Sequence, residues 1–182
     1  MCRSNYTAIK AQGVRLQTRN FGEYTFQPEN IFPSISAAGG QEWDYVVVTT
    51  KALPDMSDDS ETVVPTVGPR TAIVLIQNGV GVEEPYRRRF EGNVILSAVT
   101  VVSAEQVEPG VVVQNRWTRI SVGPSTNGTG INESNAKTRD FVELLKQGGI
   151  KDAEIYDEKG LQQVRWHKIA VGEQGFFWCW SS

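Results

Sequence analysis

The sequence predicts an α/β fold in which helices cover both faces of an open, mostly parallel sheet. Two apolar runs, WDYVVVTT at 43–50 and TAIVLIQ at 71–77, are continuous rather than alternating, as in strands buried on both faces of a parallel sheet. A weakly helical stretch and the Gly68-Pro69 turn lie between them. Parallel neighbours require such a crossover, and crossovers are right-handed, so we expect a doubly wound arrangement.

The amino-terminal part of the chain predicts a short helix followed by a hairpin. Helical spacing of apolar residues covers 5–13, and Gly13 supplies a stop. Residues 14–18 and 23–26 are rich in strand formers around an Asn and a Gly, which indicates two antiparallel strands. The Pro-, Ser- and Gly-containing segment 28–40 is expected to be a loop.

The second apolar run is followed by a turn and a helix. We expect the segment 78–81, Asn-Gly-Val-Gly, to open a helix that ends near Phe90. Glu83 and Glu84 would then lie in its first turn, where negative charge is favourable to the helix dipole.

The remaining sequence predicts further strands and two helices. A third strand is expected at 94–102, and two β-rich pieces, 110–114 and 119–123, predict an antiparallel extension at the sheet edge. The spacing over 134–147, with Phe141, Leu144 and Leu145 on one face and two glycines after it, predicts a helix. A short strand at 150–156 precedes a last helix, capped by Asp157, that carries His167 and Lys168.

Composition and charge narrow the functional classes. The 182 residues are 40% hydrophobic and 21% charged, as in a folded globular domain. The net charge of −3 arises from 21 acidic and 18 basic residues that are well mixed, which argues against a nucleic-acid partner. No apolar run reaches the roughly 18 residues of a membrane span. Two cysteines, Cys2 and Cys179, give neither a disulfide framework nor metal-ligand spacing, so we expect a cytoplasmic protein without a metal site.

Polar residues that directly follow the two apolar runs are the first candidates for ligand binding. In open α/β sheets, ligands bind beyond the carboxyl ends of the strands, where Lys51 and Asn78 are expected. Gly79 would let a ligand approach the backbone. Position alone also fits a simpler interpretation, in which Lys51 merely ends a strand and Asn78-Gly79 is an ordinary turn.

Five segments together resemble a known family. CRSNY, VVVTTKALPD, IVLIQNGVGVEEPYRRRF, SAVTVVSAEQVEPG and VRWHKIA occur in the order and spacing of ketopantoate reductases (2-dehydropantoate 2-reductases). The resemblance covers residues 2–171. It implies a partial NADP-binding, Rossmann-like domain over 1–156, the start of a helical region at 157–171, and an atypical aromatic tail at 172–182.

The resemblance also implies roles for five residues. Arg3 would meet the 2′-phosphate of NADPH, Lys51 would line the cofactor cleft, and Asn78, followed by Gly79, would hold the cofactor and the keto acid in register. Lys168 matches the catalytic lysine of the family, and an ammonium can stabilise charge on a ketone oxygen and donate its proton. Without the resemblance, Arg3 would be a disordered terminal arginine and Lys168 a solvated helix lysine. His167 is expected to be structural, and Trp166 to pack in the core.

The sequence departs from the family in two places. No Gly-X-Gly-X-X-Gly motif occurs in the chain, and Gly172 stands where the family has an asparagine. We therefore expect the domain to lack its first strand and glycine-rich turn, together with the carboxyl-terminal helical domain.

The expected activity is NADPH-dependent reduction of 2-dehydropantoate to pantoate, or of a similar small 2-keto acid, in pantothenate biosynthesis. The alternative is a non-catalytic, nucleotide-binding fragment of such a reductase. A third possibility is a non-functional product of a faulty gene model. The sequence gives no indication of the oligomeric state.

Overall fold

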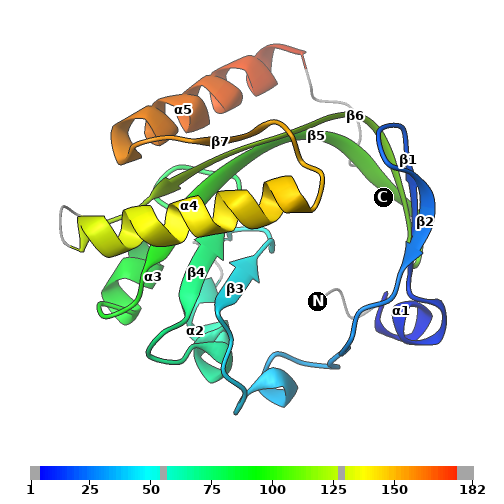
Figure 1. Ribbon diagram of the computed structural model, residues 1–182, viewed down its shortest axis with the longest axis horizontal. Helices are drawn as coiled ribbons and strands as arrows, with labels where there is room; N and C mark the ends of the chain where they lie inside the picture. The colour runs from blue at the N-terminus through cyan, green and yellow to red at the C-terminus, as the bar shows by residue number, and fades with distance from the viewer. Residues whose placement is uncertain (1–4, 54–56, 127–129, 176–182) are drawn as a thin grey trace.

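The computed structural model describes residues 5–53, 57–126 and 130–175, with the side chains described as far as residue 170. These residues form one seven-stranded sheet and its covering helices (Figure 1). In chain order the elements are α1 (Tyr6–Gln12), β1 (Val14–Thr18), β2 (Gly22–Phe26), η2 (Ser36–Ala38), β3 (Tyr45–Val48), α2 (Asp59–Thr62), η3 (Val64–Thr66), β4 (Ala72–Leu75), α3 (Glu84–Arg89), β5 (Ile95–Glu108), β6 (Val111–Pro124), α4 (Ile131–Gln147), β7 (Ala153–Ile155) and α5 (Glu158–Gly175).

The sheet is mostly parallel, as the sequence predicts. Its strand order is β2-β1-β6-β5-β4-β3, and β7 pairs with β6 beyond the end of β1. Strand β4 pairs in parallel with β3 on one side and with β5 on the other, and β6 is parallel to both β1 and β7. The hairpins β1–β2 and β5–β6 are antiparallel.

Strand β4 separates two hydrophobic cores. Its four residues are all 0% exposed, and alternate side chains point to opposite faces of the sheet. Val74 packs with Phe141 and Val142 of α4 on one face, where Figure 1 shows α4 lying across the sheet. Ile73 and Leu75 pack on the other face with residues from the α2 and α3 region. Helices therefore cover both faces, which confirms the doubly wound fold.

Several expected elements are present with small differences. Gly13 ends α1, the hairpin is formed, and α4 ends at Gly148. The Asp157 Oδ1 accepts a hydrogen bond from the Gly160 N–H at 2.7 Å at the start of α5, which confirms the expected cap. Of the apolar residues expected on one face of α4, Phe141 is buried, whereas Leu144 is 52% exposed.

Strand β3 is an edge strand of the described sheet. The continuous apolar run predicted burial on both faces, but Val47 is 45% exposed and Val48 alone among the residues of β3 is buried. Within residues 5–53, 57–126 and 130–175, β4 is the one strand that hydrogen-bonds to β3. The run of valines therefore reports strand propensity here rather than full burial.

The pieces 110–114 and 119–123 belong to one strand, β6, which lies inside the sheet between β1 and β5. The expectation of an extension at the sheet edge was therefore wrong. The polar residues between the two pieces suggested a break, but they are exposed and continue the ribbon with β5. The pairing of β5 with β6 is irregular at this point: its register shifts on both sides of Ser103, and Trp117 has a φ of 54°.

Helix α3 begins at Glu84 and not at the Asn78–Gly81 turn. Gly79 and Gly81 have φ values of 118° and 74°, which a right-handed helix cannot contain. The turn is therefore a separate feature at the end of β4.

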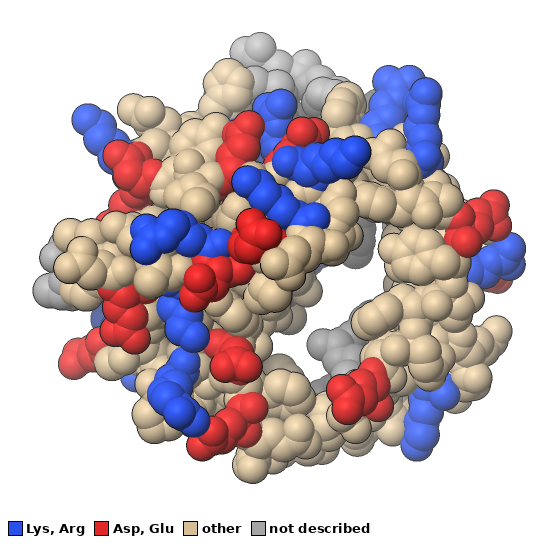
Figure 2. Space-filling view, in the orientation of Figure 1, with Lys and Arg blue, Asp and Glu red and all other residues tan. Residues whose placement is uncertain are grey.

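No helix in the described part of the chain is long and apolar enough to cross a bilayer. On the face seen in Figure 2, basic and acidic side chains are interspersed rather than grouped by sign.

We predict that Leu96→Ala destabilises the fold far more than Leu144→Ala. Leu96 is 0% exposed in the core beneath α4, so the substitution should lower the free energy of unfolding by about 2–5 kcal/mol. Leu144 is half-exposed, so its truncation should cost about 0.5 kcal/mol or less. Urea denaturation followed by circular dichroism measures both values. Equal losses in the two variants would contradict the assignment of the core.

Candidate active site

The carboxyl end of β4 brings together the two most informative residues of the sequence. Lys168 on α5 donates hydrogen bonds from Nζ to the Asn78 Oδ1 at 2.7 Å and to the Thr100 carbonyl on β5 at 2.8 Å. Its ammonium therefore links the segment that follows β4 to the middle of the neighbouring strand β5. Asn78 follows β4 by three residues, and the half-buried Lys168 reaches it from the covering helix.

The environment of Lys168 favours the loss of its proton. Burial is the larger cause and the cation of Arg165 is the second, and together they lower the pKa of the Lys168 ammonium below its usual value. The two hydrogen bonds hold the ammonium in place at the same time. A fixed ammonium with a lowered pKa is suited to stabilise developing oxyanion charge and to give up a proton.

Arg165 and Glu83 form a buried ion pair beneath the turn. Their side chains are 3% and 1% exposed, and Arg165 Nε lies 3.1 Å from the Glu83 Oε1. Ser97 on β5 donates to Glu83 at 2.5 Å and accepts from Arg165 Nη2 at 2.6 Å. Glu83 was expected to stabilise the first turn of a helix. It lies at the start of α3, but its carboxylate pairs with the Arg165 guanidinium.

The turn from Asn78 to Gly81 leaves its backbone accessible. Gly79 has a φ of 118°, and a Cβ there would lie 3.0 Å from the Val82 Cγ1. Gly81 has a φ of 74° with open space where a Cβ would be. A side chain would therefore be strained at both positions, and the backbone can be approached closely at Gly81.

Gln77 ties the ends of β3 and β4 to α2. Its buried Nε2 donates to the Thr50 carbonyl at 3.1 Å and to the Asp59 Oδ2 at 3.0 Å. Val48 pairs with Leu75 in the parallel register, so Lys51 and Asn78 each lie three residues beyond this pair. Lys51 is exposed at the same edge of the sheet as Asn78.

The structure brings together Asn78, Gly79 and Lys168 and places Lys51 at the same edge, whereas Arg3 lies outside the described residues. His167 is exposed. Trp166 is 61% exposed, so the expectation that it packs in the core was wrong.

Sequence reasoning missed Arg165, which has more contacts with the turn than any predicted residue. The inward face of α5 is formed by Leu161, Arg165 and Lys168, at intervals of four and three residues. Trp166 stands next to this stripe and points outward, since adjacent helix residues are about 100° apart. The spacing could have placed Arg165 on the stripe that contains an apolar residue and the matched lysine, but it could not show which groups Arg165 contacts.

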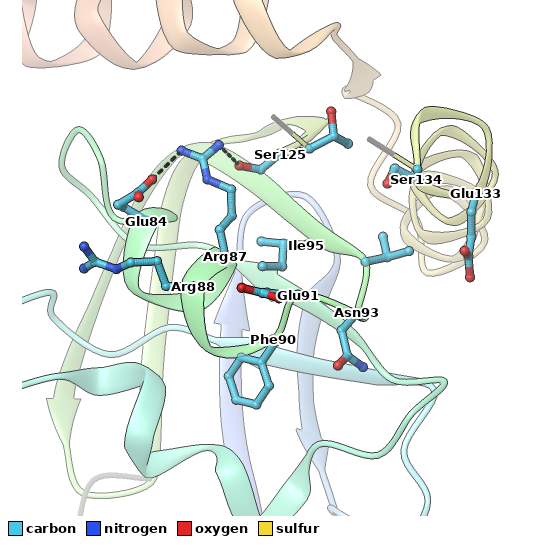
Figure 3. A pocket seen from close by; sticks show the side chains of 14 residues that line it. Glu84, Arg87, Arg88, Phe90, Glu91, Asn93, Ile95, Ser125, Glu133 and Ser134 are labelled. Atoms are coloured by element: carbon cyan, nitrogen blue, oxygen red, sulfur yellow. Dashed lines mark hydrogen bonds and ion pairs between the residues drawn. The ribbon is translucent and has the colours of Figure 1, made fainter. Parts of the chain in front are cut away.

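A cavity lies at the opposite end of the strands from Lys168. It has a volume of about 540 Å³ and is lined by α3, the start of α4 and the amino end of β5 (Figure 3). Strand β5 runs away from this cavity, from Ile95 to Thr100 at the Lys168 site. In Figure 3, Arg87 lies between Glu84 and Ser125, and its Nη1 donates a hydrogen bond to the Ser125 Oγ at 2.9 Å. The cavity is therefore separate from the Lys168 site. Among the described residues, no cluster of His, Cys, Asp and Glu could hold a metal ion.

The comparison with family models gives one match. The model described as ketopantoate reductase PanE/ApbA matches residues 1–127. The Saccharomyces cerevisiae protein named Uncharacterized protein YDL144C is 26% identical over 190 residues, which cover 92% of this chain and 52% of the yeast protein. The 2-dehydropantoate 2-reductase of Caulobacter vibrioides is 32% identical over 84 residues, 45% of this chain and 29% of that protein. The chain thus spans about half the length of the yeast relative, and its match covers 29% of the bacterial one.

Solved structures of similar proteins establish the fold. The 2-dehydropantoate 2-reductase from Geobacter metallireducens GS-15 has a TM-score of 0.78 and 24% identity, covering 94% of this chain and 53% of that one. D-Mandelate dehydrogenase, solved with NADH and anilino(oxo)acetate, has a TM-score of 0.66 and 17% identity, covering 93% and 50%. The Rossmann-like fold expected from the sequence is therefore confirmed.

We predict that the lowered pKa of Lys168 makes stability depend on pH. Because the folded pKa lies below the unfolded value, the unfolded chain binds more protons between the two pKa values, so stability rises with pH in that window. The unfolding free energy of the wild type relative to Lys168→Met should therefore increase as the pH rises towards about 10.4, the ordinary lysine value. Urea titrations of both proteins across this range measure it, and a pH-independent difference would contradict the burial of the ammonium.

Proposed function

The chain belongs to the ketopantoate reductase PanE/ApbA family, and we propose that it binds NADP(H) and reduces 2-dehydropantoate, or a similar small 2-keto acid, with Lys168 as the proton donor. Residues 1–156 would supply the cofactor-binding part, and 157–171 would begin the helical region. The reduction of 2-dehydropantoate to pantoate belongs to pantothenate biosynthesis.

The geometry of Lys168 carries this proposal. Its ammonium is held by Asn78, just beyond the carboxyl end of β4, and by Thr100 on the neighbouring strand β5, and ligands of open α/β sheets bind beyond the carboxyl ends of strands. The lowered pKa supports proton donation. A structural lysine on a solvated helix surface would need neither of these hydrogen bonds.

The residues at this edge fit part of a dinucleotide. The Asn78–Gly81 turn has two glycines with positive φ, which let a flat ring or a phosphate come close to the backbone. Lys51 is an exposed cation at the same edge and would attract cofactor phosphate. Arg3 is proposed to meet the 2′-phosphate, in which case NADPH would bind more tightly than NADH.

The reaction follows from these groups. When bound, NADPH would supply the hydride that reduces the keto carbon of the substrate. The Lys168 ammonium then donates its proton to the oxygen, which becomes a hydroxyl, and the neutral amine regains a proton from water. Asn78 holds the ammonium through its Oδ1 and leaves its amide N–H groups to orient the keto acid.

We predict that Lys168→Ala lowers kcat for 2-dehydropantoate reduction by about 10²–10⁴-fold, because the positioned proton donor is lost. Lys159→Ala is the matched control, since Lys159 is an exposed lysine on the same helix, and it should leave kcat unchanged. NADPH consumption by the full 182-residue chain measures both rates. Equal effects of the two substitutions would remove Lys168 from the mechanism.

Fluorescence titration with NADPH, and with NADH as the control, tests the cofactor. Saturable binding that prefers NADPH and weakens in Arg3→Ala and Lys51→Ala supports the proposal. Binding without turnover would instead favour the second candidate, a nucleotide-binding module without catalysis. No binding of either nucleotide would overturn both.

A further inference from the structure

Helix α5 brings two cations to the Asn78 turn. Arg165 Nη1 donates to the carbonyls of Gln77 at 2.7 Å and Gly79 at 3.1 Å, which lie on either side of Asn78. Lys168 donates to the Asn78 side chain at 2.7 Å. The two cations are three residues apart on one helix face, so a single helix fixes both the backbone and the side chain of the turn.

The same guanidinium is anchored to the sheet. Arg165 donates to the Ser97 Oγ from Nη2 at 2.6 Å and to the Ala98 carbonyl at 3.3 Å, and it pairs with Glu83 at 3.1 Å. Glu83 lies just after the turn, and Gln162 on α5 donates to it at 3.3 Å. The turn is therefore held between β5 and α5 from both of its ends.

Stability alone does not account for this ion pair. Burying two charges carries a desolvation penalty, and well-packed apolar residues of similar size often stabilise a protein equally or better. Arg165 is 3% exposed and cannot touch a substrate. Its Nη1 instead holds the carbonyls of the two residues that flank Asn78, and it lies on the same face of α5 as Lys168.

We propose that Arg165 and Glu83 are positioning residues. They fix the Asn78–Gly79 turn, and Arg165, held in place by Glu83, keeps a positive charge near Lys168, so that the Asn78 and Lys168 side chains address one substrate carbonyl. This inference rests on the proposed function for its purpose. The groups that Lys168 contacts on β5 and after β4 are neutral, a carbonyl and an amide oxygen. Among the described residues, Arg165 is the charged group that, after burial, lowers the Lys168 pKa.

The test uses the double variant Glu83→Leu with Arg165→Met in the full chain, because it removes both buried charges and leaves neither unpaired. We expect the variant to fold, by circular dichroism, and the Lys168 pKa to rise, measured by NMR of ¹³C-labelled lysine. The backbone order parameters of Asn78 and Gly79 should fall from about 0.85, typical of rigid backbone, towards about 0.6. Arg87→Met is the control, because Arg87 is another partly buried, ion-paired arginine at the opposite end of the strands. It should change neither quantity.

A folded double variant with wild-type values for the Lys168 pKa and the order parameters would overturn the proposal. If the double variant does not fold, Arg165→Lys decides. It retains the charge but loses the guanidinium fork, in which Nη1 binds both carbonyls while Nε and Nη2 hold Glu83 and Ser97. The turn should therefore become mobile, and an equally rigid turn would overturn the proposal.

These readouts need no cofactor or substrate, so the two proposals fail separately. If the wild type shows no reduction of 2-dehydropantoate but the double variant loosens the turn and raises the Lys168 pKa, the positioning unit stands and the proposed reaction does not. If the wild type is active and the double variant retains kcat, KM, the pKa and the order parameters, the reaction stands and the positioning unit does not.

Discussion

The buried ion pair between Arg165 and Glu83 is the interaction on which the site depends. It joins the covering helix α5 to the segment that follows the Asn78–Gly81 turn, and Ser97 connects both partners to β5. Since each partner is almost fully buried, removal of one alone would leave an uncompensated charge in the interior. The pair therefore fixes the position of α5 relative to β5 and to the end of β4. This in turn fixes the position of the Lys168 ammonium beside Asn78.

The layered fold supplies the platform beneath this pair. Strand β4 sends Val74 to one core and Ile73 and Leu75 to the other, so its end is held on both faces. The parallel register of β3 and β4 puts Lys51 and Asn78 at one edge. In open α/β sheets, ligands bind beyond the carboxyl ends of parallel strands, which is where Lys51 and Asn78 lie.

The sequence predicted the local elements better than it predicted the contacts between distant segments. Lys51, Asn78 and Lys168 could be proposed as candidate site residues because each follows a clear strand or matches a family motif. The role of Arg165 depends on contacts with Gln77 and Gly79, 88 and 86 positions away, which no local pattern reveals. For the same reason, the edge position of β3 and the continuity of β6 through Trp117 required the strand order, since it is set by pairing between distant segments.

The most direct test of the central claim is a map of backbone amide chemical shifts during NADPH titration of the ¹⁵N-labelled chain. If the nucleotide binds at this edge of the sheet, the largest changes fall on Asn78, Gly79 and Gly81 and on the end of α5 near Lys168. Gly92 and Gly130, which line the cavity at the opposite end of the strands, should be unaffected. Changes confined to that cavity would contradict a nucleotide site at the carboxyl end of β4.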